Sequence, residues 1–253
     1  MQSSIRRTGK QVTDNYCFTC LKIGDKFDAG YVNKLQNMVR QYSDAPFLCF
    51  TDDPTGVEMP CVHMDDKVER DWDNWWPVWC KIKMFNAPQL EGFDRKIFFD
   101  LDVIIHGDIS KLLDHRSRRN TFSLIRSVWR GKTYQIANPT KSLFNSSCMV
   151  WSDNKKIYDK WMQDPKGYVA KYHGTDDFYH NEKIIRKPLP DIFYSYREGH
   201  TDQGKKWNEP IWMKMSLDHS IAILHQDPKP HTLNIKEHPI VLYWNGSKQR
   251  SAI

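Results

Sequence analysis

The sequence lacks the features that mark membrane and secreted proteins. It has no run of about 18 apolar residues, the length that a membrane span needs. Its polar start, MQSSIRRTGKQVTDN, contains no apolar core of a secretion signal. The expected location is therefore the cytoplasm, or the host cytoplasm if the source is a virus. Internal repeats and low-complexity linkers are also missing, which excludes a repeat architecture.

Cysteine does not occur in the pattern that structural zinc sites need. The six cysteines lie mostly in apolar runs, as reduced core thiols do. Cys17 and Cys20 form one CxxC, but no second CxxC or histidine pair follows at zinc-finger spacing. Both cysteines are therefore interpreted as packing residues.

The composition that remains is globular. Of 253 residues, 40% are apolar and 27% are charged. This predicts one folded domain over residues 1–253, with a flexible N-terminus of about residues 1–14. The net charge of +6 favours anionic partners such as nucleotides, phosphates, nucleic acid or acidic glycans. Two short basic clusters are interpreted as solvated surface: Arg116, Arg118 and Arg119, and Lys205 with Lys206.

Alternating strand and helix patterns predict an α/β fold. A strand is expected over Tyr16–Ile23 and a second over Pro46–Phe50. Between them, apolar residues recur at helical spacing: Tyr31, Leu35, Met38, Val39 and Tyr42. Two strands with one helix between them favour a parallel unit, whose ligands lie beyond the carboxyl ends of the strands. Ligand contacts are therefore expected near Thr19–Lys22 and Thr51–Asp53.

The rest of the chain continues this pattern. The Trp-rich segment Trp72–Phe85 is expected to end as a helix with Lys81 and Lys83 off its apolar face. Arg186–Met215 is expected to be irregular and close to a binding cleft. Further strands are predicted over Lys96–Leu101, Thr121–Arg126, Ser147–Trp151 and Ile221–Leu224, and a helix near Asn154–Met162. The predicted sheet is mixed, mostly parallel and flanked by helices.

Asp100 and Asp102 follow the apolar strand that ends in FFDLD. In an extended segment both carboxylates would project to the same side, and two like charges that close need a cation between them. Oxygen ligands together with a diphosphate suit Mg²⁺ or Mn²⁺. The alternative is that one aspartate caps a turn and the other is a surface residue.

The order of several motifs resembles a known family. FFDLD, the earlier CFTC, the TDDP after the second strand and the late ILHQDPKPH together resemble GT-A glycosyltransferases. The similarity is to the glycogenin and lipopolysaccharide-galactosyltransferase group and its small bacterial or phage relatives, over roughly Tyr16–His231. It implies a single GT-A, Rossmann-like domain that moves a hexosyl group from a UDP-sugar to an acceptor hydroxyl. Slow hydrolysis of the donor is expected as a side activity.

The resemblance also implies roles for individual residues on the donor side. Thr19, Cys20 and Leu21 would line the uridine pocket. Asp52 or Asp53 would bind the nucleotide, although both also suit a plain turn before Pro54. Lys81 would contact donor phosphate or sugar, with Lys83 as the weaker candidate.

The metal site of the family would be formed by Asp100, Asp102 and His225, with Asp100 and Leu101 also against the donor. An imidazole beside two carboxylates shifts the preference towards Mn²⁺. Lys229 would bind the diphosphate and stabilise the leaving group. Gln226 departs from the pattern, because relatives often carry glycine there.

The acceptor side is less defined. Asn145 or Ser146 would face the sugar, or would simply begin a strand. Asp176 and Asp177, with Lys81, are the candidate catalytic residues. The alternative is a helix start, with Thr175 as the cap and both acids favouring the dipole. The acceptor itself, whether glycan, lipid-linked sugar or protein, stays open, as do the donor sugar and the choice between inversion and retention.

Two other function classes remain. FFDLD also resembles the strand of haloacid-dehalogenase-like phosphatases, but Val103, Ile104 and Ile105 replace the small or hydroxylated residues expected there. A non-catalytic module could bind glycans or nucleic acid through interleaved aromatic and basic residues such as Trp129 and Arg130. The presence of Asp100, Asp102, His225 and Lys229 favours retained chemistry.

Overall fold

The computed structural model describes residues 15–116, 122–184, 186–201 and 212–246. The predicted flexible N-terminus lies outside these ranges, as do all residues of the predicted basic clusters except Arg116. Within the described ranges, no helix combines the length and the apolar character needed to cross a membrane.

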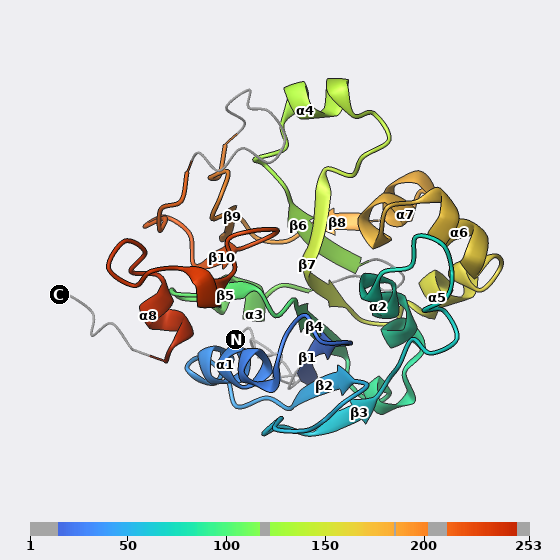
Figure 1. Ribbon diagram of the computed structural model, residues 1–253, viewed down its shortest axis with the longest axis horizontal. Coiled ribbons are helices and arrows are strands. Elements are labelled where there is room, and N and C mark those ends of the chain that lie inside the picture. Colours follow the sequence, from blue (N-terminus) through green and yellow to red (C-terminus); the bar gives the residue numbers. More distant parts are fainter. Residues whose placement is uncertain (1–14, 117–121, 185, 202–211, 247–253) are drawn as a thin grey trace, which may run out of the picture.

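A seven-stranded sheet forms the centre of the molecule (Figure 1). Its strands are β1 (Tyr16–Lys22), β2 (Phe47–Thr51), β3 (Cys61–His63), β4 (Arg95–Phe99), β6 (Phe122–Arg126), β7 (Phe144–Trp151) and β8 (Arg186–Pro188). The order is β3-β2-β1-β4-β7-β6-β8, with β1 to β4 mutually parallel. β7 runs antiparallel to both of its neighbours, and β8 is parallel to β6. The predicted mixed and mostly parallel sheet is confirmed.

A small second sheet lies beside the first. It contains β5 (Val103–Ile105), β10 (Ile221–Ile223) and β9 (Phe193–Ser195), in that order. β10 is antiparallel to β5 and parallel to β9. The apolar run that was predicted as one strand over Lys96–Leu101 therefore stops at Phe99, turns over Leu101 and Asp102, and re-enters the second sheet as β5.

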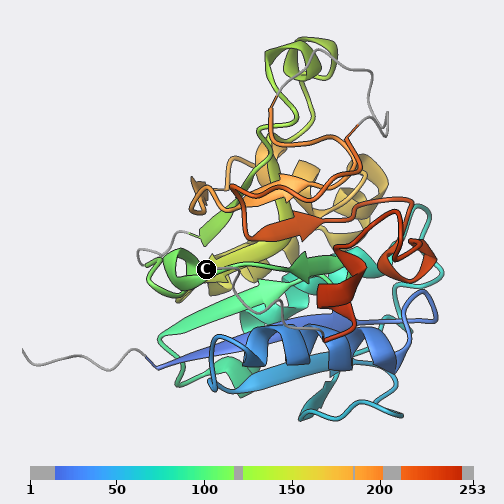
Figure 2. The same cartoon turned by 90° about the vertical axis from the view of Figure 1, so that its left-hand side faces the viewer.

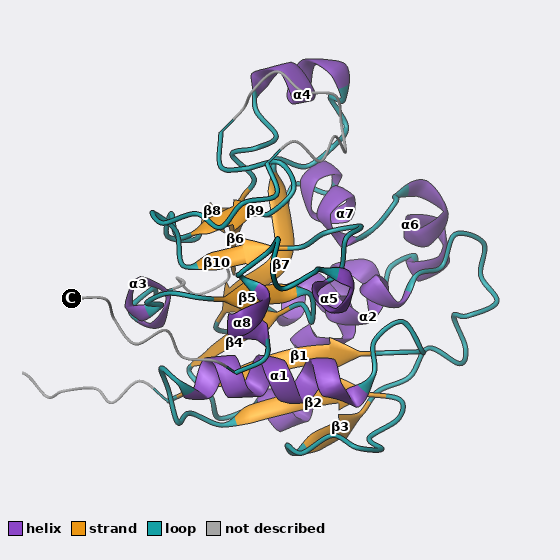
Figure 3. Cartoon of the chain, turned by 60° about the vertical axis from the view of Figure 1, so that its left-hand side comes forward, coloured by secondary structure: helices purple, strands orange, loops and turns teal. Residues whose placement is uncertain are grey.

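Helices cover both faces of the large sheet (Figure 3). One apolar cluster holds α1 (Ala29–Arg40), α3 (Ser110–Leu113) and α8 (Val241–Trp244), which follows the short turn η4 (Pro230–Thr232). The other holds the successive turns η1 (Pro77–Trp79), α2 (Cys80–Lys83), η2 (Met84–Asn86) and η3 (Pro88–Leu90), with α5 (Lys155–Trp161), α6 (Pro165–Lys171) and α7 (Thr175–Asn181). α4 (Lys132–Ala137) stands apart at one end of the molecule (Figure 2).

α1 shows why the predicted helix forms. Asp28 caps it by accepting a hydrogen bond from the Tyr31 amide, with an N···Oδ1 distance of 3.2 Å. Leu35, Met38 and Val39 recur on one turn-spaced face and are buried against the sheet. The helix ends at Arg40, so Tyr42 lies just beyond it.

The stretch Arg186–Met215 is less irregular than predicted. It contains β8 and β9, each of three residues, and residues 202–211 lie outside the described ranges. Strands this short leave little alternation for a sequence pattern to reveal.

Candidate functional site

A cavity of about 710 Å³ opens where the strands of the large sheet end. The carboxyl ends of β1 and β4 meet the amino end of the antiparallel β7 there. The start of α7 and the loop after β10 complete the wall. The lining includes Leu21, Ile23, Lys26, Phe27, Trp76, Lys81, Asp100, Leu101, Asp102, Asn145, Ser146, Ser147, Asp176, Asp177, His225, Gln226 and Lys229.

Asp100 pairs with Lys81 on one side of this cavity. The Lys81 Nζ lies 2.7 Å from Asp100 Oδ1 and 3.2 Å from the Ser146 carbonyl oxygen. Burial raises the pKa of Asp100; the Lys81 ammonium opposes that effect and Asp102 adds to it. Lys81 is itself only 3% exposed, so its charge is paired inside the protein and is not solvated at the surface. Lys83, partly exposed, pairs instead with Glu69 at 2.7 Å and does not line the cavity.

Asp102 pairs with a second buried lysine. The Lys229 Nζ donates to Asp102 Oδ2 at 2.5 Å and to the Leu224 carbonyl oxygen at 3.0 Å. The Leu224 amide in turn donates to the Asp102 carbonyl oxygen at 3.1 Å. The loop after β10 is thereby fastened to the acidic pair through both main chain and side chain.

His225 contacts Glu198 and Trp129. Its Nε2 lies 2.8 Å from Oε1 of the buried Glu198, and its ring stacks on Trp129 with centroids 6.1 Å apart. Within the described ranges, no three His, Cys, Asp or Glu side chains are close enough together to hold a metal ion. The structure therefore does not gather the predicted set of Asp100, Asp102 and His225, and it leaves the two carboxylates as candidate oxygen ligands.

The first strand brings one of its three predicted residues to the cavity. Leu21 lines it, whereas Thr19 and Cys20 are fully buried within the sheet. Cys20 belongs to the apolar cluster that contains α1. Successive side chains of a strand point to opposite faces, and only the last residues of β1 reach its open end. The Thr19 and Cys20 side chains therefore do not reach the cavity, and a contact of these residues with uridine would have to come from their backbone.

Asp52 and Asp53 organise loops and do not line the cavity. The Gly24 amide donates to both carboxylate oxygens of Asp52, at 3.2 and 3.1 Å. Asp53 accepts from the Thr55 amide at 2.9 Å, and its hydrogen bonds to Thr55 lower its pKa. Asp53 therefore forms the turn that was the alternative interpretation. Asp52 instead fixes the loop that carries the cavity residue Ile23.

The start of α7 supplies the acidic end of the cavity. Asp176 Oδ1 accepts from the Ser146 amide at 3.1 Å, and Asp177 Oδ2 accepts from Lys141 at 2.6 Å. Both acids lie in the first turn, as predicted. The N-cap, however, is Gly174, and Thr175 is buried inside the helix, so Thr175 is not the cap. Asn145 and Ser146 line the cavity and lie at the start of β7, as the strand interpretation predicted.

Gln226 occupies a backbone position that favours glycine. Its φ is +58°, in the left-handed region that residues with a Cβ atom seldom adopt. Its side-chain oxygen accepts from Arg197 at 3.2 Å. Gln226 therefore adopts the left-handed backbone conformation that glycine would favour, and its side chain is held by Arg197.

Several site residues carried no recognisable sequence signal. Glu198 lies in the stretch predicted to be irregular, and no spacing links it to His225, 27 positions later. Lys141 was equally unmarked, although it holds Asp177. Such pairs depend on which loops the fold brings together, so only the three-dimensional structure identifies them.

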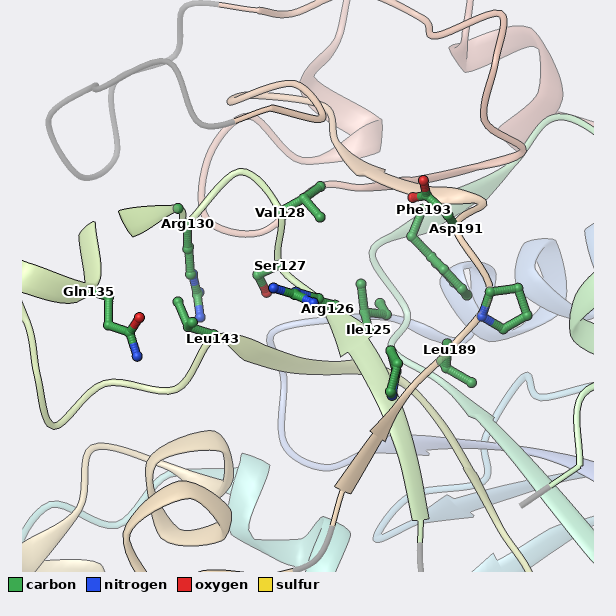
Figure 4. A pocket seen from close by; sticks show the side chains of 13 residues that line it. Ile125, Arg126, Ser127, Val128, Arg130, Gln135, Leu143, Leu189, Asp191 and Phe193 are labelled. Carbon is green, nitrogen blue, oxygen red and sulfur yellow. The ribbon is translucent and has the colours of Figure 1, made fainter. Parts of the chain in front are cut away.

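A second cavity of about 690 Å³ is lined by the end of β6, the segment that leads into α4, and the connection between β8 and β9. Arg130 lines both cavities, and Figure 4 shows Arg126, Gln135, Asp191 and Phe193 with it around the second one.

No protein-family model and no curated protein matches the sequence. Solved structures do match. The galactosyltransferase LgtC, crystallised with donor and acceptor sugar analogs, is 9% identical, with 93% of this chain and 98% of LgtC covered and a TM-score of 0.58. The glycosyltransferase GlyE of Streptococcus pneumoniae TIGR4 is 12% identical, with 90% and 60% covered and a TM-score of 0.59.

A third similar structure is a glycosyltransferase involved in glycosylation of the major capsid of PBCV-1. It is 10% identical, with 88% of this chain and 98% of that protein covered and a TM-score of 0.52. At these identities the likeness is one of fold, and the chain has the GT-A fold that the sequence resemblance implied.

Proposed function

We propose that this chain is a metal-dependent glycosyltransferase that moves a hexosyl group from a UDP-sugar to an acceptor hydroxyl. The observation that carries the proposal is one cavity at the strand ends in which two lysines and two aspartates meet. The shared fold of three glycosyltransferases supports it. No observation on the described residues favours the phosphatase or the non-catalytic module.

Lys229 and Lys81 are the proposed partners of the donor diphosphate. Both line the cavity and both are nearly fully buried, so their charges act where little water screens them. A diphosphate that enters beside them would exchange part of their contact with Asp102 and Asp100 for contact with phosphate oxygens. Positive charge fixed in advance stabilises the leaving UDP as its negative charge develops.

The chemistry of Asp100 and Asp102 fits a hard divalent cation. Mg²⁺ is commonly held by one or two carboxylates together with substrate phosphates, so a preformed cage of three side chains is not required. When bound, Mn²⁺ or Mg²⁺ would offset the charge of the diphosphate. We assign His225, held by Glu198, to shaping the loop that carries Lys229.

Asp176 and Asp177 are proposed to lie beside the donor sugar. An inverting reaction would use one of them to take the proton of the acceptor hydroxyl, and a retaining reaction would use them to orient the sugar. The Asp177 contact with Lys141 and the Asp176 contact with the Ser146 amide hold both carboxylates at this end of the cavity.

Thermal unfolding with UDP, with Mn²⁺ and with both tests the proposal, because a ligand that binds only the folded state raises its stability. We expect UDP to raise the melting temperature only when Mn²⁺ is present, and Asp102→Asn to abolish that rise. Asp159→Asn, which changes an exposed carboxylate on α5, is the matched control and should behave as wild type. Release of UDP from UDP-glucose or UDP-galactose should follow the same pattern.

Each alternative has its own outcome. An unchanged melting temperature under all conditions contradicts the UDP assignment. A rise with UDP alone keeps the nucleotide and contradicts the metal requirement. His225→Ala bears on the metal site: a Mn²⁺-dependent rise that persists in this variant supports coordination by the two carboxylates without His225.

A further inference from the structure

Three cysteines lie side by side on neighbouring strands, and none of them lines the cavity. The parallel register pairs Cys20 of β1 with Cys49 of β2, and Cys49 with Cys61 of β3. Adjacent strands place such Cα atoms about 4.8 Å apart. That spacing lies within the range of roughly 4.4–6.8 Å found for disulfides. Cys20 and Cys61 both neighbour Cys49 closely enough for their side chains to lower its pKa, and all three thiols are free.

The three cysteines differ in their access to solvent. Cys20 and Cys49 are completely buried, whereas Cys61 is exposed on the outermost strand of the sheet. Only Cys61 of this row can meet a soluble oxidant. Cys49 lies directly behind it and can meet only its neighbours.

Cys49 is also prepared to act as a nucleophile. The hydrogen bond from the Cys20 thiol lowers its pKa, and Lys22 acts in the same direction against the effect of burial. A sulfur with thiolate character attacks an oxidised neighbouring sulfur readily.

We propose that Cys61 and Cys49 form a redox-modification site in which a hydroperoxide converts the pair to an intramolecular disulfide. Burial and the neighbouring Cys49 raise the pKa of Cys61, so its thiol must first lose a proton. The Cys61 thiolate then attacks one peroxide oxygen, the O–O bond breaks, and Cys61 becomes a sulfenic acid. The Cys49 sulfur then attacks the Cys61 sulfur, and the hydroxyl group leaves as water with the remaining proton. With hydrogen peroxide, the sulfurs lose two electrons and two protons in all, and two waters form.

The sequence provides a direct readout. Residues 41–67 form one tryptic peptide, since Arg40 and Lys67 bound a stretch without Lys or Arg, and it contains both Cys49 and Cys61. Cys17 and Cys20 fall in a different peptide, residues 11–22. The purified chain is treated with hydrogen peroxide, unfolded, alkylated and digested for mass spectrometry. We expect peptide 41–67 to escape alkylation and to lose two hydrogens, while peptide 11–22 is alkylated at both cysteines.

Three results would overturn the proposal: a doubly alkylated peptide 41–67, a link between peptides 41–67 and 11–22, or a link between two chains. Cys61→Ser, an exposed change, should remove the internal link. Cys49→Ala should leave the Cys61 sulfenic acid unresolved, so that dimedone labels Cys61 strongly. If Cys49→Ala fails to fold, the comparison of wild type with Cys61→Ser decides.

Discussion

At the residue scale, buried lysines balance the charges at the end of β4. Asp102 and Lys229 have side chains that are only 12% and 9% exposed, and 2.5 Å separates the charged atoms. A buried ion pair of this kind contributes little more to folding stability than two apolar residues would. Loss of one partner, however, leaves the other charge buried without a counter-charge. The pair therefore restricts which single substitutions the site tolerates.

Lys229→Met is predicted to lower the free energy of unfolding by about 3–5 kcal/mol, because it leaves the Asp102 carboxylate buried without its cation. Urea unfolding of the purified variant measures the change. The double variant Asp102→Asn with Lys229→Met removes both charges and should recover much of the loss. Equal losses in the single and double variants would show that the pair contributes no coupling.

Individual site residues were predictable where a charged side chain follows an apolar strand or helix in the sequence. The acidic pair, Lys81 and Lys229 all line the cavity that the sequence located at the strand ends. The side chains of Thr19 and Cys20 do not line the cavity, because both are buried within β1 and only the last residues of the strand reach its open end. Glu198 was missed because its partner lies on a distant segment, and no local pattern encodes that contact.

At the scale of elements, one side chain sets the start of α1. Asp28→Ala is predicted to lower the free energy of unfolding by about 1 kcal/mol, because the Tyr31 amide loses its acceptor. Asp28→Ser keeps an acceptor at the cap and should stay close to wild type. Urea unfolding of both variants measures the difference, and equal stability of Asp28→Ala and wild type would contradict the capping role.

Elements with strong periodicity were predicted well. α1, β1, β2, β7 and α5 lie within a few residues of their predicted bounds. β8 and β9 were missed because three residues carry no period. The break between β4 and β5 was also missed, because residues 97–99 of β4 and all of β5 are apolar and only the pairing partners distinguish the two strands.

At the scale of the whole molecule, a partly buried histidine links stability to pH. Burial, aided by the nearby His219, lowers the pKa of His106 from its usual 6.5 to about 4. The unfolded chain therefore binds a proton between pH 6.5 and 4 that the folded chain does not. Stability is complete above pH 6.5 and is lost as the pH falls towards 4, by about 3 kcal/mol for this residue.

Urea unfolding at pH 7 and pH 4.5 tests this link. His106→Gln should reduce the loss of stability at the lower pH, since the neutral amide cannot titrate. His63→Gln changes an exposed histidine and serves as the matched control, with the wild-type pH dependence expected. If His106→Gln loses as much stability on acidification as wild type does, His106 is not the responsible group.

The acidic pair also joins the two sheets of the fold. β4 belongs to the large sheet and β5 to the small one, and the only residues between them are Asp100, Leu101 and Asp102. Lys81 of α2 forms an ion pair with Asp100 of this junction, and Lys229, in the loop after β10, forms one with Asp102. A ligand bound in the cavity should therefore slow amide hydrogen exchange in both sheets together. Ligand binding would in this way also stabilise the connection between the two sheets against local opening.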